Sequence, residues 1–94
     1  METRVERCPE RSRYELRRGE ELLGLADYRE LQGGSVIELP HTEVDPSMQG
    51  RGLGAVLVKA VLDDLMARDV TVVPSCWYVA AFLDQHPEYE RLRT

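Results

Sequence analysis

The sequence predicts a mixed α/β fold of the α+β kind, in which an antiparallel β-meander leads into a right-handed strand–helix–strand crossover and a C-terminal helix. Three successive segments between residues 14 and 44 alternate apolar and polar side chains and are joined by short turns. A helical pattern of apolar residues begins at Leu53, and a β-branched run follows it at residues 70–73. These observations predict one mixed sheet covered by helices.

The length of the chain indicates a single domain. With 94 residues, it falls in the usual range for one domain, so we expect one unit over residues 1–94. Residues 1–12 are dense in charge and contain Pro9. We therefore expect them to form a loosely ordered or edge lead-in to the sheet.

The first three strands are expected at residues 14–17, 22–31 and 35–44. Gly19 and the pair at residues 33–34 favour the turns between them. Pro40 lies inside the third segment, and proline within a sheet belongs at an edge or a bulge. A bulge here would leave backbone groups unpaired beside residues 41–43, as bulges near active sites often do. The alternative is a strand that ends at Leu39.

Two helices and a fourth strand complete the predicted fold. The long helix begins at Leu53 and ends near Asp69, and the fourth strand covers residues 70–73. The second helix covers residues 78–85 and ends at His86, because a residue before proline avoids the helical region. Right-handed crossovers join parallel strands, so the third and fourth strands should run side by side in the same direction.

Charge and cysteine content exclude several classes of protein. The net charge of −5, from 12 basic and 17 acidic residues, speaks against a nucleic-acid-binding module. No apolar run approaches a membrane span, and the first residues are too charged for a signal peptide. Cys8 and Cys76 lie far apart, so we expect no disulfide framework, no metal site and a cytoplasmic location. The sequence does not decide between a monomer and a weak homodimer.

Three glycines immediately before and within the start of the long helix point to a phosphorylated ligand. Gly50, Gly52 and Gly54 fall within five residues. Backbone N–H groups at a helix N-terminus favour phosphate, and Arg51 adds a positive charge. A P-loop is excluded because Gly54 is followed by alanine and not by Lys-Ser/Thr. The match to the dinucleotide pattern G-x-G-x-x-G/A is weak, because no acidic residue ends the next strand.

The glycine segment resembles the acetyl-CoA loop of the GNAT N-acetyltransferase superfamily. Three further stretches, at residues 41–44, 74–76 and 86–89, resemble a minimal single-domain branch of it, and the resemblance covers residues 13–93. It implies acetyl-CoA as acetyl donor, CoA as product, an unidentified amine as acceptor, and no metal. It also implies that Thr42 and Val44 bind the pantetheine arm. By the same resemblance, the CoA pyrophosphate is bound by Gln49, Gly50, Arg51, Gly52, Leu53 and Gly54.

Four residues are candidates for catalysis. Cys76 precedes a helix, which favours the thiolate; it could accept the acetyl group, protonate the departing CoA, or be only a small buried side chain. By alternation, His41 and Glu43 point to the same face and could act as a general base, singly or as a pair. Their alternatives are a structural histidine and a solvated acid. Tyr78 could donate a proton or only pack, and Trp77 could anchor the last helix or form a wall of the CoA groove.

The resemblance leaves a second function class open. The chain lacks the long helical region and the final strand pair that usually build the acceptor pocket in larger members of the superfamily. A non-catalytic acyl-CoA-binding module on the same scaffold is therefore an alternative to an acetyltransferase. A protein-interaction domain without a ligand, whose glycines serve only a tight turn, is a third hypothesis.

Overall fold

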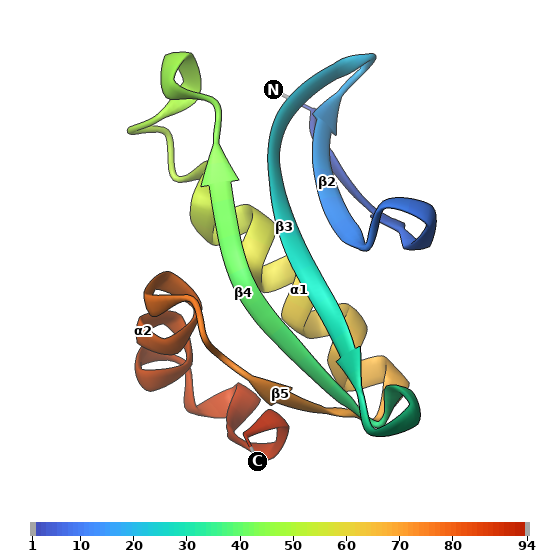
Figure 1. The fold of residues 1–94 in the computed structure, drawn as a ribbon. Helices are drawn as coiled ribbons and strands as arrows, with labels where there is room; N and C mark the ends of the chain where they lie inside the picture. The colour runs from blue at the N-terminus through green and yellow to red at the C-terminus, as the bar shows by residue number, and fades with distance from the viewer. Residues whose placement is uncertain (1, 94) are drawn as a thin grey trace.

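The computed structural model describes residues 2–93 of the chain, and Figure 1 shows its elements. One sheet contains five strands in chain order: β1 (Arg4–Cys8), β2 (Arg13–Arg18), β3 (Glu21–Leu31), β4 (Val36–Val44) and β5 (Thr71–Val73). The strands β1 to β4 are antiparallel, and β4 and β5 are parallel. The helices are α1 (Leu53–Arg68), α2 (Trp77–Gln85) and the C-terminal 3-10 helix η4 (Pro87–Leu92). The predicted meander, crossover and second helix, which is α2, are thus confirmed, whereas η4 was not predicted.

The N-terminal segment is better ordered than the sequence predicted. Arg4–Cys8 forms the edge strand β1, with Val5 opposite Leu16 and Cys8 opposite Arg13. An edge position was expected, but a loosely ordered lead-in was wrong for these residues. The strand was hard to predict because its sequence is rich in charged residues. Those at the outward-facing positions form ion pairs on the surface of the sheet. Arg4 and Glu6, for example, are paired at 2.8 Å.

A bulge in β4 shifts its side-chain alternation. The register with β3 passes from Asp27↔His41 to Arg29↔Glu38, so two residues of β4 face one residue of β3. Pro40 lies in this bulge, and the strand continues to Val44, so the alternative of a strand that ends at Leu39 was wrong. Because one extra residue reverses which side chains face the core, the second half of β4 presents its side chains in the opposite sense from a regular strand.

One hydrophobic core holds α1 and α2 against the sheet. Helix α1 crosses behind β3 and β4 in the view of Figure 1. Both helices and η4 contribute fully buried residues to this core, among them Leu57, Leu62, Val79, Leu83 and Leu92. This packing brings the first turns of α1 and α2 close to the second half of β4, where the candidate site residues lie.

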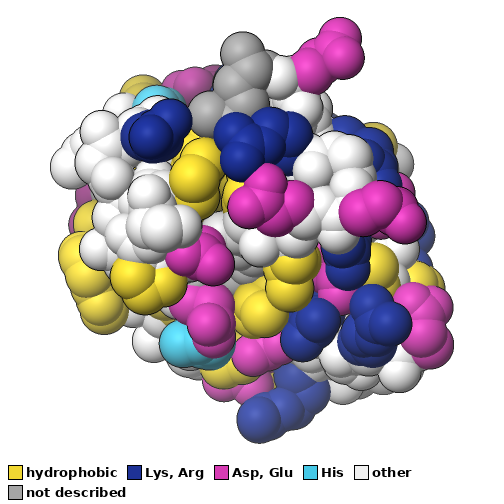
Figure 2. Space-filling model, turned by 90° about the horizontal axis from the view of Figure 1, so that it is seen from above, with side chains coloured by type: hydrophobic (Ala, Val, Ile, Leu, Met, Phe, Trp, Pro, Cys, Tyr) yellow, Lys and Arg dark blue, Asp and Glu magenta, His cyan; other side chains and the backbone are white. Residues whose placement is uncertain are grey.

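Charged side chains of both signs are interspersed over the face seen in Figure 2. The net charge of −5 therefore does not gather into one acidic region on that face. None of the helices among residues 2–93 has the length and apolar character needed to span a bilayer.

Candidate functional site

A cavity of about 640 Å³ opens where β4 and β5 separate. The two strands pair only over Val36–Glu38 and Thr71–Val73. Beyond this point the Cys76 N–H donates to the Leu39 carbonyl at 2.9 Å, and the strands then part. The edge of β4 at residues 41–44 consequently lines a cavity on the side where β5 pairs with its first half. A volume of this size is in the range of small-molecule sites, roughly 300–1,000 Å³.

The glycine segment forms the mouth of this cavity. Gly50 and Gly52 have φ angles of +84° and +74°, which L residues rarely adopt. A Cβ atom at either position would meet nothing within 4 Å, so the backbone here lies open to a ligand. Asp45 shapes the turn before the loop, because its carboxylate accepts from both the N–H and the hydroxyl of Ser47. Gln49 donates to the Val44 carbonyl at 3.4 Å, which ties the loop to β4.

The N-terminus of α1 is suited to an anion. Gly52 is its N-cap residue, and the first helical bond runs from the Val56 N–H to the Gly52 carbonyl. The N–H groups before Val56 in the first turn therefore have no partner within the helix. No side chain caps them, and the first turn contains no acidic residue. Arg51 is exposed and forms no ion pair with any residue between 2 and 93, so its charge is available at the same place.

Cys76 lies at the inner end of the cavity, as the N-cap residue of α2. Its Sγ atom is 3.5 Å from the Thr42 hydroxyl. Burial raises the pKa of this thiol, but the Thr42 hydroxyl and the backbone amides of Val79 and Tyr78 outweigh burial and bring it below its ordinary value of 9.0. The structure thus brings Cys76 and Thr42 together in a setting that favours the thiolate.

His41 and Glu43 form a second pair along the cavity. Their side chains point to the same face, as predicted, and His41 Nε2 lies 2.8 Å from Glu43 Oε1. Both side chains are more than half exposed. The bulge at Pro40 turns them to the face of the sheet opposite α1, whereas Thr42 and Val44 face the helices. No hydrogen bond within the described residues joins this pair to Cys76.

Tyr78 connects the two helix starts. A Cβ atom at Gly54 would lie 3.0 Å from the Tyr78 hydroxyl, so glycine at this position of α1 allows the tyrosine to approach. Tyr78 is partly buried and lines the cavity next to Leu53 and Cys76. Both packing and a position beside the predicted ligand site are therefore observed for this residue.

Several residues that line the cavity were not predicted as site residues. Met48, Leu57 and Ser75 belong to this group, and Ser75 donates to Glu38 at 2.6 Å. Trp77 also lines the cavity, but its 79% exposure shows that the alternative of an anchor for the last helix was wrong. Ser75 could have been predicted as a site residue, because it directly precedes Cys76. Met48 and Leu57 line the cavity only as a result of tertiary packing, which the local sequence does not reveal.

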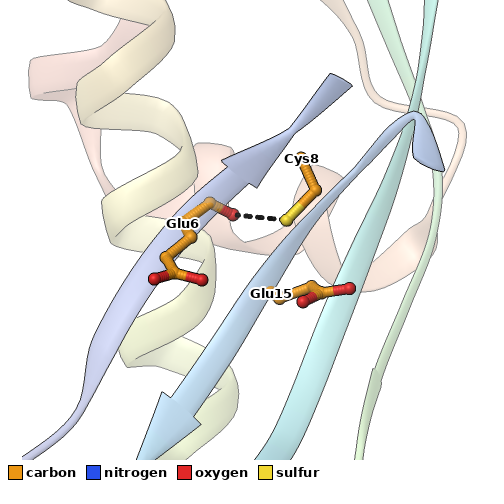
Figure 3. Close-up of side chains that lie close together, drawn as sticks. All are labelled: Glu6, Cys8 and Glu15. Atoms are coloured by element: carbon orange, nitrogen blue, oxygen red, sulfur yellow. Dashed lines mark hydrogen bonds between the residues drawn. The ribbon is translucent and has the colours of Figure 1, made fainter. Parts of the chain in front are cut away.

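Another cluster of polar groups lies on β1 and β2, away from the cavity. Figure 3 shows Glu6, Cys8 and Glu15, with Cys8 Sγ directed at the Glu6 carbonyl at 3.9 Å. Their potential ligand atoms lie within 4.8 Å of one another, a separation that could suit a metal ion. Both oxygens of Glu15, however, already accept from the guanidinium groups of Arg11, Arg13 and Arg17. These contacts account for the cluster as an ion-pair network in the sheet.

Comparisons with known proteins agree with this geometry. Residues 13–92 match the family model described as GCN5-related N-acetyl-transferase. The chain is 36% identical to Protein NATD1 of Bos taurus over 58 residues, and this matched segment covers 62% of this chain and 51% of that protein. It is 34% identical over 62 residues to Protein NATD1 of Danio rerio, covering 64% of this chain and 56% of that protein. The chain thus spans about half the length of the curated relatives it matches.

The fold also matches a solved structure. A GCN5-like protein from Staphylococcus aureus, determined by NMR, superposes with a TM-score of 0.71 at 20% identity. The superposition covers 97% of this chain and 87% of that chain. At this identity the similarity concerns the fold, and it extends over nearly the whole of the sheet and helices described above.

Proposed function

Because the chain belongs to the GCN5-related N-acetyltransferase family, we propose that it binds acetyl-CoA in the cavity beside β4 and transfers the acetyl group to an amine. The observation that supports this proposal best is the open glycine segment at the start of α1, which lies at the mouth of a cavity leading to Cys76. The acceptors of the longer relatives are not carried over, since this chain matches only about half of their length.

The pyrophosphate of CoA is assigned to the loop and the first turn of α1. Backbone N–H groups there have no partner within the helix, and the missing Cβ atoms of Gly50 and Gly52 let an anion approach the backbone. Arg51 supplies a positive charge. In this proposal Gln49, Leu53 and Gly54 complete the loop, Gln49 by its bond to β4 and Gly54 by its contact with Tyr78.

The pantetheine arm is assigned to the separated edge of β4. Residues 41–44 line the cavity there, with backbone groups able to pair with an extended ligand. Thr42 and Val44 face the helix side of this edge, and the Thr42 hydroxyl lies beside Cys76. An arm that follows this edge from the loop leads toward the thiol.

Acetyl-CoA supplies an acetyl group activated as a thioester. When an amine attacks the carbonyl carbon, the carbon–sulfur bond breaks and the departing sulfur needs a proton. The Cys76 thiol or the Tyr78 hydroxyl can donate it. In the alternative route the Cys76 thiolate attacks first, forms an acetyl-cysteine and releases CoA, and the amine then takes the acetyl group from Cys76. The lowered pKa of Cys76 supports this second route.

His41 and Glu43 are assigned to the acceptor. An amine must lose a proton to attack and to complete the transfer, and a positioned base contributes roughly 10²–10⁴-fold to the rate. The pair is exposed to solvent and lines the same cavity, so an amine from solution can reach it. The 2.8 Å contact lets Glu43 hold the imidazole and stabilise it when it gains the proton.

A matched pair of loop variants tests the proposal. Asp and Asn both tolerate the positive φ of Gly52, and neither meets a neighbouring atom within 4 Å at Cβ. Gly52→Asp places a negative charge beside the pyrophosphate, and such like-charge contacts cost roughly several kcal/mol. Calorimetric titration with acetyl-CoA is expected to show an affinity loss of at least about tenfold relative to Gly52→Asn. Both variants should keep the wild-type circular dichroism spectrum.

Further outcomes separate the routes. Absence of acetyl-CoA binding by the wild-type protein would contradict the proposal. Intact-mass analysis after incubation with acetyl-CoA detects an acetyl group on Cys76, and Cys76→Ala must abolish that adduct. Binding without CoA release in the presence of any amine would instead favour the non-catalytic acyl-CoA-binding module.

A further inference from the structure

A second hollow lies between the sheet and the C-terminal half of α1. Its volume is about 220 Å³, and it shares no lining residue with the cavity proposed for acetyl-CoA. Residues of the first four strands and of the last turns of α1 line it, among them Arg7 and Arg68, and we call it the Arg7–Arg68 pocket. It lies at the other end of α1 from the glycine segment, so the proposed function makes no use of it.

The pocket combines aliphatic surface with basic groups. Ile37 of β4 and Leu65 of α1 are 4% and 1% exposed, and together with Val70 they provide the aliphatic part of the lining. Arg7 and Arg68 bring two positive charges to the same pocket. This combination suits a ligand that has an apolar part and a group that accepts hydrogen bonds.

The two arginines keep most of their hydrogen-bonding capacity. The Arg7 guanidinium stacks on the Tyr28 ring, 5.0 Å from its centroid, and contacts Glu30 through Nη2 alone at 3.3 Å. Arg68 donates to Asp64 through Nε at 2.8 Å. Since a guanidinium carries five N–H donors, these bonds within residues 2–93 leave most donors of both groups for a ligand.

Both guanidinium groups lie near one point, the Tyr14 hydroxyl. Burial and the bond to Asp64 raise the pKa of Tyr14. The charges of Arg7 and Arg68 both act against this rise in the pKa, as they can only from nearby. Among the described residues that line the pocket, Glu30 is the only carboxylate, so the lining carries a net positive charge.

The Tyr28 hydroxyl is an unused hydrogen-bonding group at this pocket. Tyr28 is only 7% exposed, yet its hydroxyl forms no hydrogen bond with any residue between 2 and 93. In the same part of the chain no fully buried polar side-chain atom lacks a partner, so this hydroxyl reaches open space. Buried tyrosines usually bond through their hydroxyl. An oxygen of a ligand in the pocket, which Tyr28 lines, would supply that partner.

We propose that the Arg7–Arg68 pocket binds a small monocarboxylate with a short aliphatic chain. The carboxylate accepts hydrogen bonds from Arg7, Arg68 and the Tyr28 hydroxyl, because a guanidinium fork matches the geometry of a carboxylate. The chain packs on Ile37 and Leu65. A volume of 220 Å³ holds roughly seven water-sized groups, which matches a ligand of the size of butyrate. This inference is independent of the proposed function.

A single methyl group can report on the pocket. Ile37 is the only isoleucine in the sequence, so protein labelled with carbon-13 at the isoleucine δ1-methyl gives one NMR signal from the pocket lining. Sodium butyrate is titrated into this protein and compared with 1-butanol, which lacks the carboxylate, and with acetate and inorganic phosphate, which lack the chain. Butyrate is expected to shift the signal with a millimolar dissociation constant, and the other three to shift it little.

Variants test the residues that would hold the carboxylate. Arg7→Gln and Arg68→Gln are each expected to weaken butyrate binding by about ten- to 100-fold, as hydrogen bonds to charged groups are lost. Tyr28→Phe keeps the ring and should weaken it by about two- to tenfold. Lys59→Gln is the matched control, because Lys59 is also a cation of α1 paired with an aspartate, Asp63 at 2.9 Å, but does not line the pocket. It should leave the dissociation constant unchanged, and the unliganded Ile37 signal checks that each variant is folded.

Three results would overturn the inference. The first is an Ile37 signal that does not move with butyrate. The second is an equal response to 1-butanol, acetate or phosphate, which would reveal an apolar hollow or a site for any anion. The third is an unchanged dissociation constant in both Arg7→Gln and Arg68→Gln. Each of these results leaves the proposed function standing, since titration with acetyl-CoA tests the cavity at the other end of α1.

Discussion

The two cysteines show how neighbouring residues set the chemistry of one side chain. Cys8 and Cys76 are buried to the same degree, at 8% and 9% exposure. Burial raises the pKa of the Cys8 thiol, and the carboxylates of Glu15, Glu10 and Glu6 raise it further. The pKa of Cys76 is lowered instead, because hydrogen-bond donors that include Thr42 outweigh burial. Because the two thiols are about equally accessible, we expect their reactivities to differ according to the fraction of each that is present as thiolate.

This difference predicts selective alkylation. At pH 7.5 the protein is expected to react with iodoacetamide several-fold faster at Cys76 than at Cys8, since the thiolate is the nucleophile. Peptide mass mapping over time measures both rates in one sample, and Cys8 serves as the internal control. Thr42→Val keeps the side-chain shape but removes the hydroxyl, so it should slow Cys76 alone. Equal rates in the wild-type protein would show that the environment of Cys76 does not favour the thiolate.

Local pattern determined which site residues could be predicted. The shared face of His41 and Glu43 follows from strand alternation, and the place of Cys76 at a helix start follows from the break at Pro74. The exposure of Trp77 could not be predicted, because a helix pattern does not reveal which neighbours the rest of the chain provides. The proximity of Thr42 to Cys76 depends on the pairing of β4 with β5, which is a property of the whole sheet.

Among the elements, β2 departs most from its sequence pattern. Alternation over residues 14–17 suggests that Glu15 faces water, yet its side chain is only 1% exposed. Three arginines, from η1 (Pro9–Arg11) and from β2 itself, cover it and bind its carboxylate. Burial raises the pKa of Glu15, but Arg17, Arg13 and Arg11 outweigh burial and lower it from 4.5 to about 2. A polar residue in an alternating strand is therefore not always a solvated one.

This network makes the stability of the sheet depend on pH. The ionised form of Glu15 contributes stability that is complete above its unfolded pKa and is lost as the pH falls from about 4.5 to about 2. The shift in pKa corresponds to about 3 kcal/mol at most, and water around the partly exposed arginines reduces this figure. Glu15→Gln is expected to lower the free energy of unfolding by about 1–2 kcal/mol at pH 7. Urea denaturation at pH 7 and pH 3 measures the effect.

The control for this prediction is Glu20→Gln, which changes an exposed carboxylate in the turn between β2 and β3. This variant should leave the unfolding free energy unchanged at pH 7. The difference between Glu15→Gln and wild type should also shrink at pH 3, because the unfolded state then gains a proton at Glu15 while the folded state still keeps the carboxylate ionised. A difference that stays constant between the two pH values would show that the ionised form of Glu15 is not what stabilises the strands.

At the scale of the whole molecule, the C-terminal segment completes the core. The Cα radius of gyration is 12.6 Å, close to the value of about 12 Å expected for a folded chain of this length. Within η4, Tyr89 and Leu92 are 4% and 1% exposed, and the Tyr89 hydroxyl donates to Asp63 of α1 at 2.6 Å. Arg93 then bridges to Val72 in β5. The segment thus links the long helix to the sheet.

Removing one side chain from this segment is expected to destabilise the entire protein. Leu92→Ala leaves a cavity in the core, and such changes cost about 2–5 kcal/mol. Small proteins have unfolding free energies of only about 5–15 kcal/mol, so the midpoint of urea denaturation should fall sharply. The neighbouring Arg91→Ala, which changes an exposed side chain, should have a small effect. A Leu92→Ala midpoint equal to that of wild type would show that η4 is not part of the cooperative unit.

The order of β2 to β5, α1 and α2 could be predicted because each of these elements has a clear local pattern, whereas the 3-10 helices, η4 among them, were not predicted. Strand β1 was missed since its charged side chains obscure the alternation and its pairing with β2 becomes apparent only in three dimensions. The bulge at Pro40 was predicted from the proline itself, but its effect on the direction of the following side chains requires the register with β3. The sequence thus predicts most helices and strands and the glycine loop, whereas the register and packing of these elements are known only from the structure.

The bulge in β4 also bears on how homologous sequences are aligned. We expect a deletion of one residue at Pro40 to remove the bulge and to leave the register beyond it unchanged, so that His41 and Glu43 still face away from the helices and Thr42 and Val44 still face them. A gap at this point of an alignment would then preserve the site. An alignment of such a shorter relative without the gap would instead pair each residue beside Cys76 with one that is open to the solvent.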